Sequence, residues 1–122
     1  MNEKIVKLLT DLQYEMNESI AVVVEGKKDH EDLTSTGLKG RILTLSSISM
    51  NELVEGISCS CKEVIILTDF DSFGEKAAEK LRELFFNEAV KPNLSFRRRF
   101  RKLLGLVHFE DLPSLLNQEK NQ

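Results

Sequence analysis

Hydrophobic residues along the chain follow two different patterns, and each pattern predicts a different kind of element. In residues 3–14 they recur with the i, i+3, i+4, i+7 spacing of an amphipathic helix, at Ile5, Leu8, Leu9 and Leu12. Three other segments are short apolar runs rich in β-branched side chains, at residues 19–24, 42–45 and 64–67. Because these runs do not alternate with polar residues, we expect strands buried on both faces, as in a parallel sheet covered by helices.

Helical patterns lie between and after these predicted strands. Residues 29–36 and 49–57 are helix-like, and residues 72–87 predict a long helix in which Ser72 and Glu75 have the spacing of a capping box. The apolar residues expected on one face of this long helix are Phe73, Ala77, Leu81, Leu84 and Phe85. Strands that alternate with helices predict βαβ units and a parallel sheet.

The last third of the chain predicts one more strand and two helices. Residues 89–94 are expected to form a short strand, which Pro92 confines to an edge of the sheet. Residues 96–104 predict a helix with arginines outside its apolar stripe. That stripe consists of Phe96, Phe100, Leu103 and Leu104. Residues 108–116 predict a short terminal helix with Pro113 in its first turn.

The length of 122 residues predicts a single α/β domain with flanking helices. We expect residues 1–18 to form an N-terminal amphipathic helix, residues 19–94 the core, and residues 95–122 a basic amphipathic helix and tail packed on that core. The composition, 41% hydrophobic and 30% charged, is typical of globular proteins, and no apolar run approaches the roughly 18 residues of a membrane span. We therefore expect a cytoplasmic protein with no membrane partner. Cys59 and Cys61 are too few for a zinc site and are expected to be reduced.

Basic residues are concentrated near the end of the chain, although the formal net charge is −3. A stretch without acids contains Lys91, Arg97, Arg98, Arg99, Arg101 and Lys102. Arg97 and Arg101 share one face of the predicted helix, Arg98 lies on another, and the guanidinium group suits bidentate recognition of phosphate. Two interpretations stay open: these arginines bind RNA or DNA, or they form a solvated face that pairs with the chain's own acids.

Acidic and glycine residues follow directly after the first and third predicted strands. The two segments contribute Glu25, Gly26, Lys27, Lys28 and Asp29, and then Asp69, Asp71 and Gly74. Ligands of open parallel sheets bind beyond the carboxyl ends of the strands, and neighbouring strands lie about 4.8 Å apart. The sequence therefore predicts that Glu25, Asp69 and Asp71 share one small cation.

Magnesium is the expected ion, with Mn²⁺ as the alternative. Mg²⁺ takes oxygen ligands at about 2.1 Å, commonly one or two carboxylates together with water and substrate phosphate. Without a cation, two carboxylates about 4 Å apart would repel by roughly 4 kcal/mol at an effective dielectric constant of 20. Gly26 would let the backbone approach a phosphate closely, and Gly74 would let the chain pass tightly over the site.

The Glu25-Gly26 pair and the Asp69-Phe70-Asp71 motif, with Gly74 beyond it, resemble the motifs of the Toprim domain. This metal-binding module occurs in topoisomerases, primases, recombination mediators and some nucleases. The resemblance covers about residues 19–90 and implies a Rossmann-like, three-layer α/β fold with a four-stranded parallel sheet flanked by helices. The chain resembles the short stand-alone Toprim proteins of archaea, a group without a defined role, and, more distantly, ribosomal-RNA maturation ribonucleases.

The resemblance also implies roles for individual residues. Glu25 would be the general acid/base beside the scissile phosphate, and Asp69 and Asp71 would hold Mg²⁺. Asp29 is either an accessory acid of this site or a cap of the following helix, of which the cap is the preferred interpretation. Lys28, like Lys27, either contacts phosphate or is an ordinary exposed lysine.

Three functions are compatible with these residues. The leading hypothesis is Mg²⁺-dependent phosphodiester hydrolysis or a related phosphoryl transfer on RNA or DNA. The rival is a non-catalytic nucleic-acid-binding or scaffold module that retains the acids, and the third is action on a free nucleotide or small phosphate ester. A topoisomerase is disfavoured because Tyr14, the only tyrosine of the chain, lies in the predicted N-terminal helix.

Overall fold

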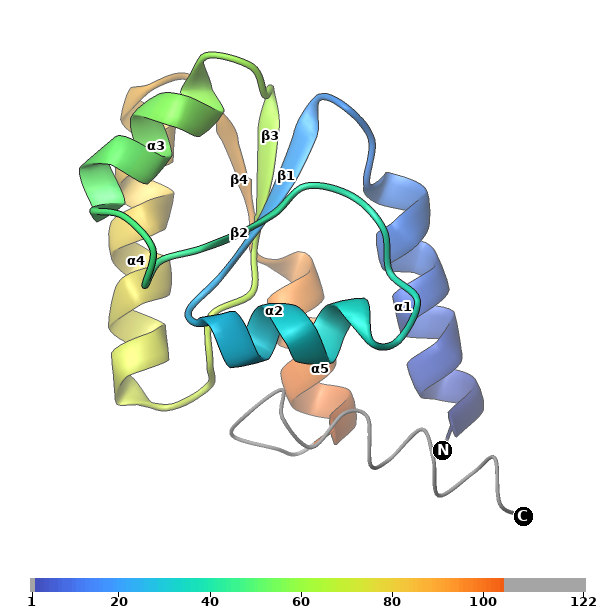
Figure 1. Ribbon diagram of the computed structural model, residues 1–122. Coiled ribbons are helices and arrows are strands. Elements are labelled where there is room, and N and C mark those ends of the chain that lie inside the picture. The colour runs from blue at the N-terminus through green and yellow to red at the C-terminus, as the bar shows by residue number, and fades with distance from the viewer. Residues whose placement is uncertain (1, 105–122) are drawn as a thin grey trace.

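The computed structural model describes residues 2–104, in which helices and strands alternate through most of the chain (Figure 1). The elements are α1 (Asn2–Glu15), β1 (Ile20–Val24), α2 (Lys27–Thr34), β2 (Ile42–Thr44), α3 (Met50–Ser58), β3 (Glu63–Ile66), α4 (Ser72–Asn87), β4 (Lys91–Asn93) and α5 (Ser95–Leu104). The predicted α/β fold class is confirmed. The helix predicted over residues 108–116, and with it the tail of the predicted 95–122 unit, lies outside the described residues.

The four strands form one parallel sheet in the order β2-β1-β3-β4. The central strands are β1 and β3, which pair with Ile20 opposite Glu63 and Val23 opposite Ile66. After β1 the chain adds β2 on one side of it and then β3 on the other, so the direction of winding reverses between β1 and β3. In open parallel sheets such a reversal opens a crevice for ligands beyond the carboxyl ends of the two strands. The acidic segments predicted to carry the chemistry follow these two strands.

Helices cover both faces of the sheet, and each face has its own apolar cluster. Val22 and Ile65 pack with residues of α1, α2 and α5, whereas Val23 and Ile66 pack with residues of α3 and α4. Figure 1 shows α3 and α4 together on one side of the sheet and α1 on the other. Burial on both faces explains why the central strands are uninterrupted apolar runs instead of alternating ones.

The start of α4 differs from the prediction in two respects. The N-cap is Asp71, whose side chain accepts a hydrogen bond from Gly74 N, so the capping box predicted for Ser72 and Glu75 is wrong. Phe73, predicted on the apolar face, is 82% exposed. The buried positions of α4 are Gly74, Ala78, Leu81 and Phe85. The face that α4 buries is therefore set by the close approach of Gly74 to the end of β3.

The last described elements bring the C-terminal helix beside the N-terminal one. The strand β4 pairs only with β3, at an edge of the sheet, and contains Pro92 as predicted. Beyond it, α5 packs against α1 and β3, with Phe96 and Phe100 buried in the same cluster as Ile5 and Leu12. Within residues 2–104, every helix is too short or too polar to cross a membrane.

Candidate functional site at the carboxyl edge

The side chain of Glu25 takes the place of a backbone acceptor where β1 and β3 separate. Leu67 N donates to Val23 O over 2.8 Å, which continues the parallel ladder. Two residues later, Asp69 N donates to Glu25 Oε1 over 3.0 Å, while the carbonyl of Glu25 accepts from Ser46 N on the β2 side. Two acids that are 44 residues apart in sequence are therefore joined at the crevice between the central strands.

Glu25 lies in an environment that favours its protonated form. Partial burial and then the negative charge of Asp69 raise the pKa of the Glu25 carboxyl above its ordinary value, and Asp71 and Asp29 raise it further. The hydrogen bond from the Asp69 backbone acts in the opposite direction. Three aspartates thus act on Glu25 together, which identifies this edge as a concentration of negative charge.

Gly74 joins the beginning of α4 to the loop that carries Asp69. A Cβ atom on Gly74 would stand 1.7 Å from the carbonyl oxygen of Asp69, a distance that no side chain can occupy. Thr68 Oγ1 donates to Gly74 O over 2.7 Å, and Asp71 Oδ1 accepts from Gly74 N over 2.8 Å. The two aspartates of the D-x-D motif are therefore held by the packing of the helix start against the strand end.

The loop after β1 has a similar construction. Gly26 is the N-cap of α2, and its backbone N donates to Asp29 Oδ2 over 3.0 Å. Asp29 thereby adopts the capping geometry that was the preferred interpretation of this residue. One turn further, Lys28 Nζ contacts Asp32 Oδ1 at 2.8 Å, and Asp32 is buried at 5% exposure. Neither the burial of Asp32 nor its pairing was predicted.

Arg97 is the residue whose environment differs most from expectation. It is only 6% exposed, and its guanidinium donates to Thr68 O over 3.0 Å and to Asp69 O over 2.6 Å. The same group lies 3.0 Å from Glu75 Oε1 and 5.5 Å from the ring centroid of Phe70. Arg97 of α5 therefore holds the backbone of the loop that bears the D-x-D motif.

The other predicted basic residues have different environments. Arg101 pairs with the same Glu75 Oε1 at 3.0 Å, with 60% of its side chain exposed, and Arg98 is exposed. The interpretation that the arginines pair with the chain's own acids thus describes Arg97 and Arg101. Nucleic-acid binding by Arg97, Arg98 and Arg101, and phosphate binding by Gly26, Lys28 and Gly74, stay predictions.

The acids of this edge suit a hard cation by their chemistry, although the described side chains do not converge on one point. Within residues 2–104, no three His, Cys, Asp or Glu side chains are arranged closely enough to hold a metal ion. The carboxylates of Glu25 and Asp71 instead accept backbone hydrogen bonds. However, oxygen donors are the ligands that Mg²⁺ prefers, and the mutual repulsion seen at Glu25 is what a cation relieves. The donor set therefore fits a divalent metal.

Comparison with known proteins identifies the fold as that of a known domain family. The model of the Toprim domain matches residues 20–103, a span that includes every acid discussed above. A solved structure of a protein from Aquifex aeolicus superposes with a TM-score of 0.77 at 25% sequence identity, covering 87% of this chain and 95% of that one. The fold predicted from the resemblance is thus confirmed.

Curated archaeal proteins are similar over most of the chain. The UPF0292 protein of Methanosarcina acetivorans is 34% identical over 113 residues, which are 93% of this chain and 78% of that protein. The UPF0292 protein of Methanocaldococcus jannaschii is 32% identical over 119 residues, 95% of this chain and 92% of that protein. The chain therefore belongs to the Toprim family and, within it, to the UPF0292 proteins. Membership in the Toprim family indicates a metal-binding, nucleic-acid-related function.

Proposed function

We propose that this protein is a Mg²⁺-dependent enzyme that hydrolyses or transfers phosphodiester bonds of RNA or DNA at the carboxyl edge of β1 and β3. The observation that carries the proposal is the hydrogen bond from Asp69 N to Glu25 Oε1. It brings the lone glutamate of one loop to the D-x-D motif of another, at the point where the sheet offers a ligand crevice. Family membership supports the same assignment.

In this proposal Glu25 transfers a proton, and Asp69 and Asp71 bind the metal. Glu25 is suited to take up or release a proton because its surroundings already raise the pKa of its carboxyl. Asp69 and Asp71 would hold the metal, and the chemistry that a divalent ion supplies when bound is neutralisation of charge on phosphoryl oxygens. Arg97 keeps the Asp69 backbone in place, and Gly74 keeps α4 close to it.

A cleavage assay with matched variants tests the proposal. Purified protein is incubated with end-labelled single-stranded and double-stranded RNA and DNA, with Mg²⁺, with Mn²⁺ and with EDTA. We expect metal-dependent products from the wild type and their loss in Asp69→Asn and Glu25→Gln, which keep the size of each side chain. Glu79→Gln, an exposed position on α4, serves as the control and should retain activity. Failure of the wild type on every substrate, or full activity of Asp69→Asn, would refute the proposal.

The alternative is a non-catalytic module that binds nucleic acid and retains the acids for folding. It is favoured by the observation that Glu25 and Asp71 each accept a backbone hydrogen bond, as structural acids do. This alternative predicts nucleic-acid binding that survives Glu25→Gln, without products from any substrate. The assay above, combined with a binding measurement, separates the two functions.

A further inference from the structure

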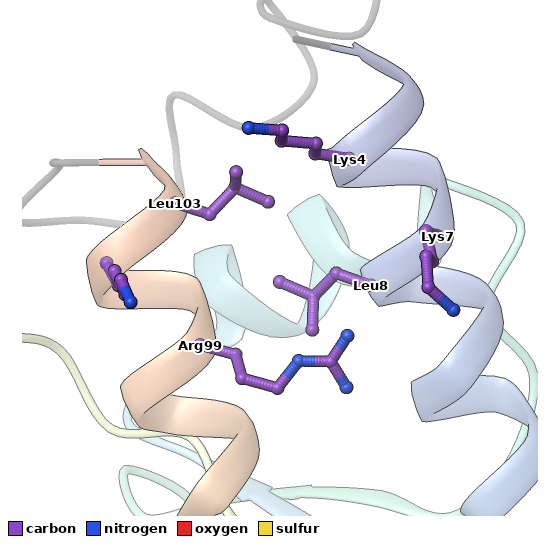
Figure 2. A pocket seen from close by; sticks show the side chains of 6 residues that line it. Lys4, Lys7, Leu8, Arg99 and Leu103 are labelled. Atoms are coloured by element: carbon purple, nitrogen blue, oxygen red, sulfur yellow. The ribbon is translucent and has the colours of Figure 1, made fainter.

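A groove with a volume of about 660 Å³ lies between α1 and α5. Within the described part of the chain, six residues line it: Lys4, Lys7, Leu8, Arg99, Lys102 and Leu103. Figure 2 shows Leu8 and Leu103 pointing into the space between the two helices, with Lys4 reaching across from α1 and Arg99 from α5. The groove thus has an apolar floor and a basic rim that is built from both ends of the described chain.

In the part of the chain that the structure describes, the basic residues of the groove outnumber the acids that pair with them. Among the described residues, none of the six that line the groove is acidic. Asp11 is paired with two of the cations, at 2.8 Å from Arg99 Nη2 and at 3.5 Å from Lys7 Nζ. Arg99 also lies over the ring of Phe96, at 5.5 Å from its centroid, so its position is defined by two contacts. Among residues 2–104, one carboxylate against four cations leaves a surplus of positive charge, which favours an anionic ligand.

The same helix connects this groove to the acid edge. One face of α5 carries Arg97 and Arg101, which pair with Glu75 beside the D-x-D loop. The other face carries Arg99 and Lys102, which line the groove. Because an α-helix rises 1.5 Å per residue, the groove residues of α5 lie within about 9 Å, along the helix axis, of the residue that holds the Asp69 carbonyl. A ligand in the groove would therefore be close to the acid edge along the axis of α5 but on the opposite side of that helix, so an extended ligand is needed to reach both.

We propose that the groove between α1 and α5 binds the phosphodiester backbone of a single nucleic-acid strand and leads it to the acid edge. The identity of this ligand rests on the proposed function. Cations spread along two helices match an anion that repeats along a chain better than a single phosphate, and a guanidinium binds phosphate bidentately. Leu103, which is only partly buried, adds an apolar surface for sugars and bases.

The test is equilibrium binding of fluorescent twelve-nucleotide oligouridylate and oligothymidylate, measured by anisotropy in EDTA so that no cleavage occurs. The groove variant is Lys4→Glu/Lys102→Glu, and the control Lys62→Glu/Lys80→Glu changes two exposed lysines elsewhere and alters the net charge equally. The groove variant should fold normally, because a glutamate near the start of α1 interacts favourably with the helix dipole and offsets the unfavourable one near the end of α5. Melting curves of both variants check this.

The expected result is salt-sensitive binding by the wild type, with a slope of log K against log salt near −2.8 if all four cations contact phosphate. The groove variant should have a slope near −1.4 and at least about tenfold weaker binding at low salt, while the control binds like the wild type. Absence of wild-type binding, equal losses in both variants, or displacement by oligoaspartate as effective as displacement by oligonucleotide would overturn the proposal.

The binding test and the cleavage test can fail separately. Groove-dependent binding without cleavage in Mg²⁺ would support the groove and remove the enzymatic function. Metal-dependent cleavage together with unchanged binding and activity of the groove variant would support the function and remove the groove.

Discussion

Arg97 Nη2 donates a hydrogen bond to the backbone carbonyl of Asp69 over 2.6 Å, and this contact joins α5 to the loop that carries the D-x-D motif. The carbonyl of Thr68 accepts a second hydrogen bond from the same guanidinium. Both carbonyls lie beyond the end of β3, where the sheet offers no partner strand for them. The C-terminal helix therefore supplies charge-assisted hydrogen bonds to two backbone carbonyls of the acid loop.

Replacement of Arg97 by methionine should destabilise the protein by about 3 kcal/mol. Methionine keeps an unbranched apolar stem but leaves two buried carbonyls without their charged donor, and each such hydrogen bond contributes about 1.5–3 kcal/mol. Urea denaturation measures the change. Arg98→Met, one residue away and exposed, should change the free energy of unfolding by less than about 0.5 kcal/mol. Equal effects of the two substitutions would show that the hydrogen bonds from Arg97 to the Thr68 and Asp69 carbonyls do not stabilise the fold.

Gly74→Ala should be among the most damaging single substitutions in the chain. Its Cβ would overlap the Asp69 carbonyl oxygen, so α4 must move away from β3, at a cost of about 3 kcal/mol or more. Gly56→Ala is the matched control because this helical glycine of α3 has open space around it. It should stabilise the protein by about 0.5–1 kcal/mol through helix propensity. Thermal or urea unfolding measures the change: the stability of Gly74→Ala should fall and that of Gly56→Ala should rise. Equal stability changes in the two variants would contradict the close approach of Gly74 to the Asp69 carbonyl.

Glu25→Gln should stabilise the metal-free protein increasingly as the pH rises. Burial and the charge of Asp69 raise the pKa of Glu25 in the folded state above the value of 4.5 that it has in an unfolded chain. The folded state therefore retains this proton to higher pH, and the stability that the glutamate contributes below pH 4.5 is lost as the pH rises through the raised pKa.

Urea unfolding of both proteins in EDTA, from about pH 4 to about pH 8, measures this effect. The advantage of the glutamine variant should be small at the acidic end and reach a plateau above the raised pKa. Glu31→Gln, at an exposed position of α2, corrects for the general loss of one carboxylate. An advantage that is constant across the range, or that shrinks as the pH rises, would show that Glu25 is not in the described environment.

Substitutions of Asp71 can separate its capping role from its metal role. Asn is as good an N-cap as Asp, so Asp71→Asn should leave the stability of the metal-free protein nearly unchanged, whereas Asp71→Ala should lose about 1 kcal/mol. In Mg²⁺ at about 100 times the dissociation constant, the wild type should gain about 2.7 kcal/mol, and both variants should lose most of this gain. Asp29→Asn should keep this gain; Asp29 is the third residue of α2 and accepts a hydrogen bond from the backbone of the N-cap Gly26. A full response to Mg²⁺ in Asp71→Asn would remove Asp71 from the metal site.

Hydrophobic periodicity was sufficient to predict the order of the elements and the buried central strands. It also predicted that the loops after β1 and β3 share one edge, because ligands of parallel sheets bind at the carboxyl ends. The cap of α4 could not be chosen from local preference, since Asp71 and Ser72 are both good N-cap residues. The structure selects Asp71 because Gly74 must face the Asp69 carbonyl, and that contact turns Phe73 outward.

The contacts of the basic residues could not be predicted from the sequence, because they too depend on how the helices pack against other elements. A helical pattern shows that Arg97 and Arg101 share a face, but not that the face meets two backbone carbonyls and Glu75. Similarly, Lys4 and Lys7 are ordinary helix-surface lysines in the sequence. In the folded chain, α1 and α5 pack side by side on the same face of the sheet, and this contact places Lys4 and Lys7 in one groove with Arg99.

The most direct test of the account is the anomalous scattering of Mn²⁺ in crystals grown with that ion in place of Mg²⁺. The account predicts one strong peak at the carboxyl edge of β1 and β3, at about 2.1 Å from carboxylate oxygens of Asp69 or Asp71, with Glu25 bound directly or through a water molecule. Crystals at high Mn²⁺ concentration with no peak at this edge, or with the only peak elsewhere on the molecule, would contradict it.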